Sequence, residues 1–134
     1  MVNVKIKLAA LWIAVEFCFV YGDLLRLYSG DFVAGEGFGG MPIEAVPISM
    51  ELLWLIAAIT MAIPIVMIVL SVMLKYKADR WTNIVVSILF IIYNIVGLSG
   101  GSYSSAYDKF LIVVSLVFNL LITWYAWRWR NQDA

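Results

Sequence analysis

Residues 50–74 read MELLWLIAAITMAIPIVMIVLSVML, an apolar run whose single charged residue, Glu51, lies near its start. About 20 consecutive apolar residues are enough for a helix to cross the hydrocarbon core of a bilayer. A strand of a membrane barrel is shorter and alternates between apolar and polar residues, which this run does not. The stretch therefore predicts a transmembrane helix. We expect Pro64 to kink it, because proline removes one intrahelical hydrogen bond.

Three further apolar runs of similar length lie at residues 8–27, 81–98 and 110–127. We therefore predict an all-α fold: one membrane domain, residues 1–134, built as a four-transmembrane-helix bundle with up-down topology. The composition agrees, since 64% of the residues are hydrophobic and 13% are charged, whereas soluble domains are less apolar and more charged. Nine Lys and Arg balance nine Asp and Glu. We expect no nucleic-acid partner, because no basic excess is left to bind phosphates.

The positive charges predict how the bundle lies in the membrane. Seven of the nine cations fall on one side of the predicted spans: Lys5, Lys7, Lys75, Lys77, Arg80, Arg128 and Arg130. Short cytoplasmic segments of membrane proteins are enriched in Lys and Arg. We therefore expect a multi-pass protein of the cell (inner) membrane with both termini in the cytoplasm and membrane lipid as a partner.

The residue types present restrict the chemistry. The chain has no histidine and one cysteine, Cys18. This excludes an intramolecular disulfide, tetrahedral zinc sites built on His and Cys, His-ligated haem and nucleophilic dyads that contain His. We expect no metal and no cofactor, and we assign no catalytic residue. Any acid–base chemistry would depend on carboxylates, tyrosines or lysines.

The first predicted helix carries a polar stripe. At 100° per residue, Trp12, Glu16, Phe19, Asp23 and Arg26 share one face. Glu16 lies near the middle of the span, with no cation within two turns on its own helix. A charged carboxylate at that depth is costly, so Glu16 should be protonated, directed into a wet cavity or paired with a polar group such as Asn94, Asn119 or Thr60. Asp23 and Arg26 are three residues apart, and a structural ion pair is the alternative to a functional role.

The other predicted helices each carry a polar stripe as well, which suggests a bundle with a polar axis and an outward-opening cavity. Such residues are often only interhelical hydrogen-bonding groups. The stripes are Thr60, Pro64, Met67 and Ser71; Asn83, Ser87 and Asn94; and Ser115 and Asn119. The residues we predict to bind a ligand or couple to a proton are Glu16, Asp23, Arg26, Asn94, Asn119, Glu51, Trp12, Thr60 and Tyr93.

Several segments carry a family resemblance. They are residues 63–71, IPIVMIVLS; residues 74–84, LKYKADRWTNI; Leu11-Trp12 with Asp23; and residues 124–127, WYAW. Together they resemble a prokaryotic family of small four-helix integral membrane proteins known only as a domain of unknown function. In that family a glutamate usually stands where this chain has Ala62, an asparagine where it has Asp79, and an acidic residue near Ser115. The resemblance implies the four-helix fold but no mechanism.

Three classes of function fit this sequence. The first is a binding or transport protein that takes a small lipophilic or cationic molecule into the cavity, with a homodimer as the expected assembly. The second is a membrane-embedded acid–base enzyme, similar to an isomerase or cyclase, acting on an isoprenoid, sterol-like or quinone substrate. The third is a structural or accessory membrane subunit. Because no catalytic motif is visible, we favour binding or transport.

Overall fold

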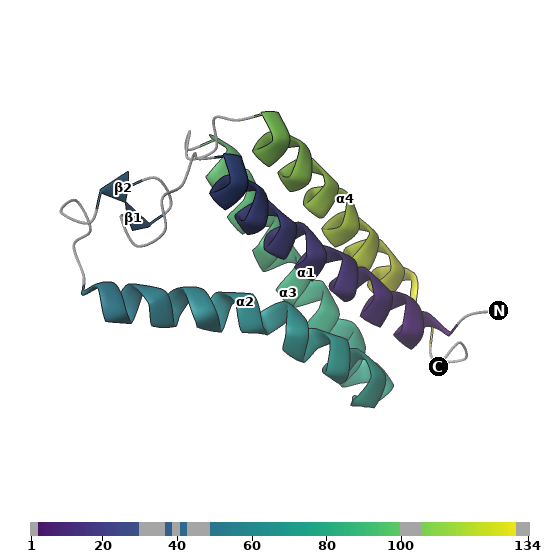
Figure 1. The fold of residues 1–134 in the computed structure, drawn as a ribbon. Helices are drawn as coiled ribbons and strands as arrows, with labels where there is room; N and C mark the ends of the chain where they lie inside the picture. The colour runs from purple at the N-terminus through teal and green to yellow at the C-terminus, as the bar shows by residue number, and fades with distance from the viewer. Residues whose placement is uncertain (1–2, 30–36, 39–40, 43–48, 100–105, 131–134) are drawn as a thin grey trace.

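The computed structural model describes residues 3–29, 37–38, 41–42, 49–99 and 106–130, and its main elements are four helices (Figure 1). The predicted all-α, four-helix fold is confirmed. Two short strands, β1 (Gly37–Phe38) and β2 (Met41–Pro42), pair antiparallel in the connection between the first and second helices. The helices are α1 (Val4–Ser29), α2 (Met50–Met73), α3 (Tyr76–Ser99) and α4 (Ala106–Arg128).

The helices extend beyond the apolar runs at several ends. Only Leu74 and Lys75 separate α2 from α3, because α3 already begins at Tyr76. At the start of α2, the Ser49 side chain accepts a hydrogen bond from the backbone N–H of Leu52, as an N-cap residue does. All four helices are long and apolar enough to cross a membrane. The chain is thus built as a multi-pass membrane protein.

The second helix is bent, and its fully buried residues all lie in its second half. α1 packs against α2 and α4, and α4 also packs against α3. None of residues 51–63 is buried, whereas Pro64, Met67 and Ser71 are. Figure 1 shows the bend in α2 near the middle of its length, as Pro64 predicts. The Thr60 hydroxyl donates to the carbonyl of Ile56 at 2.9 Å, so it does not replace the N–H that Pro64 withholds from the Thr60 carbonyl.

The polar stripes of α3 and α4 face the interior. Trp12 and Phe90 form the centre of the apolar core, with their rings edge to face at 5.9 Å. Polar side chains are buried beside them, as the stripes predict: Ser71, Asn83, Ser87, Asn94, Ser115 and Asn119. Ser87 and Thr123 join α3 to α4 through their hydroxyls, 2.7 Å apart. Buried hydroxyl and amide groups therefore connect the helices along the axis of the bundle.

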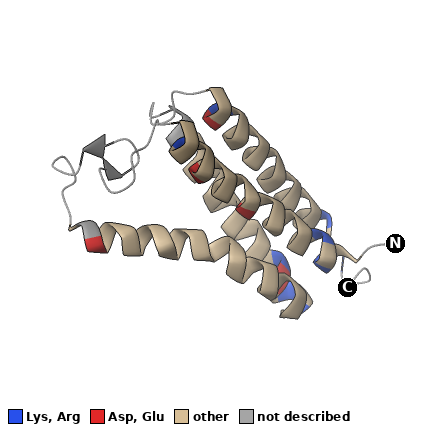
Figure 2. Ribbon diagram, viewed as in Figure 1, with Lys and Arg blue, Asp and Glu red and all other residues tan. Residues whose placement is uncertain are grey.

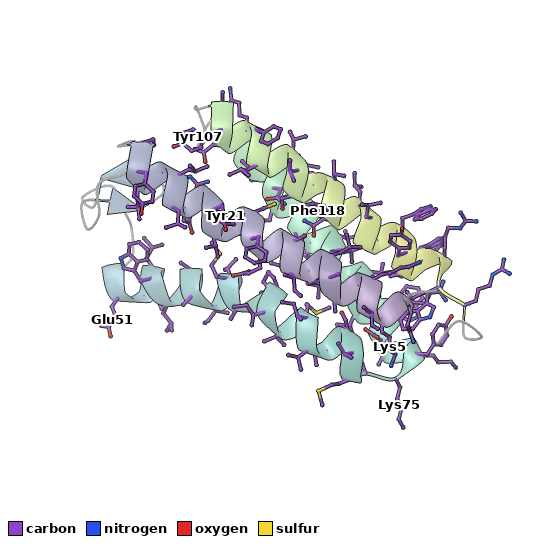
Figure 3. The ribbon with its side chains drawn as sticks, turned by 45° about the vertical axis from the view of Figure 1, so that its right-hand side comes forward. Lys5, Tyr21, Glu51, Lys75, Tyr107 and Phe118 are labelled. Carbon is purple, nitrogen blue, oxygen red and sulfur yellow. The ribbon has the colours of Figure 1, made fainter. Side chains whose placement is uncertain are left out.

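The charged residues separate toward the two ends of the bundle (Figure 2). Figure 3 places Lys5 and Lys75 at one end and Glu51 and Tyr107 at the other. We call these the basic end and the acidic end. The described cations of the basic end are Lys5, Lys7, Lys75, Lys77, Arg80, Arg128 and Arg130, and the described charged residues of the acidic end are Asp23, Arg26, Glu51, Asp108 and Lys109.

Candidate functional site

At the acidic end, Arg26 lies between two carboxylates. Its Nη1 donates to Asp23 Oδ1 at 2.8 Å and its Nε donates to Asp108 Oδ1, also at 2.8 Å. Asp108 lies in the first turn of α4, where the helix dipole favours an acidic side chain. The side chain of Asp108 is only 7% exposed, whereas that of Asp23 is 54% exposed. Arg26 therefore joins α1 to α4, and Asp23 keeps an exposed carboxylate oxygen.

A second contact holds the same two helices together. The Ser29 hydroxyl lies 2.9 Å from the Tyr107 hydroxyl, and it also donates to the carbonyl of Arg26. Arg26 and Ser29 both lie in the last turn of α1, and Tyr107 and Asp108 lie in the first turn of α4. The end of α1 is thus fixed to the start of α4 by an ion pair and a hydroxyl pair.

Directly beside this ion pair lies a small cavity of about 40 Å³, enough for one or a few water molecules. Residues from all four helices line it. Two carboxylates and one guanidinium are among them, so the wall carries an excess negative charge. The lining residues are Cys18, Phe19, Gly22, Asp23, Arg26, Met61, Tyr93, Asn94, Asp108, Leu111, Ile112 and Ser115.

The deeper polar wall of the cavity comes from α3 and α4. Asn94 Nδ2 donates to Ser115 Oγ at 3.3 Å. One turn further along α4, Asn119 Nδ2 donates to the carbonyl of Ser115 at 2.9 Å. Asn119 Oδ1 is buried and has no hydrogen-bond partner among the described residues. Among the described residues, one buried acceptor without a partner therefore lies a turn below the cavity wall.

A separate buried network lies toward the basic end. Asn83 Oδ1 accepts from Trp12 Nε1 at 2.7 Å and from Ser71 Oγ at 3.2 Å. Asn83 Nδ2 donates to Asp79 Oδ1 at 2.7 Å and to the Asp79 carbonyl at 2.8 Å. Lys5 interacts electrostatically with Asp79. Side chains of α1, α2 and α3 thus fill the interior between the cavity and the basic end.

The family model of DUF6326, a family of unknown function, matches residues 2–134. The chain belongs to this family. No match was found among curated proteins or among solved structures. Membership in DUF6326 agrees with the resemblance seen in the sequence but supplies no activity.

Four of the residues predicted for a site in this DUF6326 protein line the cavity: Asp23, Arg26, Tyr93 and Asn94. The other five do not. Trp12 belongs to the buried network, and Glu51 is exposed at the start of α2. Asn119 lies one turn below the cavity wall, and the hydroxyl of Thr60 is used within its own helix.

Glu16 lies outside the cavity lining and is half-buried. Its Oε2 is buried and has no hydrogen-bond partner within the part of the chain that the structure describes. The partners expected for it were Asn94, Asn119 and Thr60. The Nδ2 groups of Asn94 and Asn119 and the hydroxyl of Thr60 all donate elsewhere. None of these donors bonds to Glu16, because Asn94 donates to Ser115 on α4 and the other two donate to carbonyls of their own helices.

Sequence reasoning missed two buried carboxylates, Asp79 and Asp108. Each had a local signal. Asp79 precedes Asn83 by four residues, the spacing of neighbouring side chains on a helix. Asp108 lies just before the fourth apolar run, where a helix N-terminus favours an acid. The described residues contain no group of three or more His, Cys, Asp or Glu side chains that could hold a metal ion.

Proposed function

We propose that this protein binds a small organic cation, with the chemistry of a protonated alkylamine, in the cavity at the acidic end. The observation that carries this proposal is the composition of the cavity wall. It contains the carboxylates of Asp23 and Asp108 but a single guanidinium, that of Arg26. Arg26 donates to one oxygen of each carboxylate. A cationic ligand would balance the remaining negative charge.

The neutral lining also suits an alkylammonium ion. The amide oxygen of Asn94 can accept a hydrogen bond from an ammonium group. The rings of Phe19 and Tyr93, which line the same cavity, can interact with a cation through their faces. A volume of about 40 Å³ limits the fit to a small head group. A compact amine is therefore favoured over an isoprenoid, a sterol or a quinone.

The buried network supports binding rather than free passage through the bundle. A ligand moving from the cavity to the basic end would meet Trp12 and Asn83, which are both buried and joined by a 2.7 Å hydrogen bond. Breaking these contacts would leave several buried polar groups unpaired, at about 1–3 kcal/mol for each group. Transport would therefore need a second conformation in which this network has opened.

Isothermal titration calorimetry with methylammonium chloride, on protein purified in detergent, tests the proposal. Asp23→Asn should weaken binding roughly tenfold or more, because a hydrogen bond to a charged group contributes about 1.5–3 kcal/mol. The matched control is Glu51→Gln, which removes an exposed carboxylate from the same end of the bundle but outside the cavity. Wild-type protein that does not bind methylammonium, or equal losses in the two variants, would overturn the proposal.

A further inference from the structure

Among the described residues, cations far outnumber carboxylates at the basic end. Seven of the nine cations lie there. Among the described residues, the one carboxylate at this end is Asp79, which is 0% exposed and bound to Asn83. Asp133 lies outside the described residues. The exposed described side chains at this end therefore include cations and no anion.

Two of these cations are used inside the fold. Lys5 Nζ donates to the carbonyl of Leu74, the residue that ends α2, at 2.6 Å. Arg80 donates to the carbonyls of Ala126 and Trp127 in the last turn of α4, at 3.1 and 2.9 Å. Terminal carbonyls of a helix lack partners in their own helix and carry partial negative charge. Lys5 and Arg80 therefore stabilise helix ends.

Exposed aromatic rings indicate the depth at which this end would lie in a membrane. Arg80 lies 5.8 Å from the ring centroids of both Trp81 and Trp127, and Arg128 lies 5.1 Å from that of Trp124. The three tryptophans are about half exposed, at 53%, 60% and 48%. Exposed Trp side chains beside cations are typical of the lipid headgroup level. Lys75 and Lys77 precede Trp81 and Arg130 follows Trp127, so we expect these cations at the level of the lipid phosphates.

The side chains of three exposed cations of this end make no hydrogen bond, ion pair or ring contact with any described residue: Lys75, Lys77 and Arg130. Lys75 and Lys77 lie at the junction of α2 and α3, and Arg130 follows the end of α4. We propose that these three residues bind the phosphates of anionic phospholipid headgroups at the basic end. Lysine and arginine near an anionic membrane surface each contribute to such binding, and arginine can hold two phosphate oxygens at once.

This site is distinct from the cavity at the acidic end and can be tested separately. Brominated lipids quench tryptophan fluorescence on contact, and Trp81, Trp124 and Trp127 are exposed beside the proposed site. The experiment compares quenching by brominated phosphatidylglycerol with quenching by brominated phosphatidylcholine, in vesicles of the same two lipids. The variant is the triple substitution Lys75→Gln, Lys77→Gln and Arg130→Gln. The matched control is Lys109→Gln at the acidic end.

We expect wild-type protein and the Lys109→Gln control to prefer phosphatidylglycerol, and the triple variant to lose that preference. At low salt each cation removed should lower the relative affinity roughly fivefold, the equivalent of about 1 kcal/mol per basic residue near an anionic surface. Equal quenching of wild-type protein by the two lipids would overturn the proposal. So would loss of the preference on adding inorganic phosphate at constant ionic strength, since the occupant would then be free phosphate.

Discussion

Arg26 and Asp108 lie 82 positions apart in the chain, yet Nε of Arg26 donates to Oδ1 of Asp108 at 2.8 Å. The contact joins the last turn of α1 to the first turn of α4. The Asp108 side chain is 7% exposed and that of Arg26 is 19% exposed. Water therefore screens this ion pair less than it screens the pair of Arg26 with Asp23. The pair both holds α1 to α4 at the acidic end of the bundle and forms part of the cavity wall.

Asp108→Asn should destabilise the protein by about 1.5–3 kcal/mol, the usual contribution of a hydrogen bond to a charged group. Arg26 would retain Asp23, so we expect the fold to survive. The measurement is the free energy of unfolding in mixed micelles. Lys109→Gln, an exposed change at the next residue, should have almost no effect, and equal losses in the two variants would contradict the importance of the buried pair.

Asn83→Ala should be among the most destabilising single changes in the described part of the chain. It leaves Trp12 Nε1, Ser71 Oγ and Asp79 Oδ1 without the partner that Asn83 provides. Each buried polar group that loses its partner costs about 1–3 kcal/mol. The control is Val85→Ala on the exposed face of α3. Unfolding measurements that show the same stability for both variants would mean that water replaces the amide of Asn83.

Glu16→Leu should leave the stability unchanged or raise it by about 1 kcal/mol, because it removes a buried oxygen atom that lacks a partner. Glu16→Gln keeps the shape of the side chain and removes its charge, so it separates the effect of the charge from the effect of packing. Unfolding curves and methylammonium titrations of both variants provide the measurement. A clear loss of stability in Glu16→Leu would show that Glu16 pairs with a group outside the described residues.

Gly22→Ala should narrow the cavity without disturbing the fold. A Cβ atom at this position would lie 3.8 Å from Leu111 Cδ1 and 4.0 Å from Arg26 Nη2, which are ordinary van der Waals distances. Alanine is also favoured over glycine inside a helix by up to about 1 kcal/mol. We expect weaker binding of propylammonium with a smaller change for methylammonium. Equal effects on the two amines would place their binding site elsewhere.

Pro64→Ala should straighten α2 and move its first half toward α1. Alanine restores the backbone N–H that proline lacks, so the carbonyl of Thr60 regains its donor. Electron spin resonance between labels at Leu55 and Val113, both exposed, would measure the distance, with Cys18 first changed to Ala. We expect the distance between the two labels to be shorter in the Pro64→Ala variant than in the same labelled protein with Pro64 retained. An unchanged distance would mean that packing against the other helices, and not Pro64, causes the bend.

Much of the fold could be predicted from local features of the sequence. In a membrane, each helix satisfies its backbone groups within itself, so a long apolar run is sufficient to predict one. The bend at Pro64 and the pairing of Asp23 with Arg26, three residues apart, also depend only on residues that are close together in the chain. The polar stripes of α3 and α4 also predicted which faces are buried, because polar side chains avoid lipid.

Only the tertiary structure decided which polar groups meet. Apolar residues suit both lipid and the bundle interior, so periodicity alone does not fix how α1 is rotated against its neighbours. The sequence therefore marked Glu16 as a polar residue in the middle of a span but did not show that its expected partners bond elsewhere. The pairs Trp12–Asn83 and Arg26–Asp108 are 71 and 82 positions apart. Such contacts depend on the packing of whole helices, and the sequence of a single helix does not contain that information.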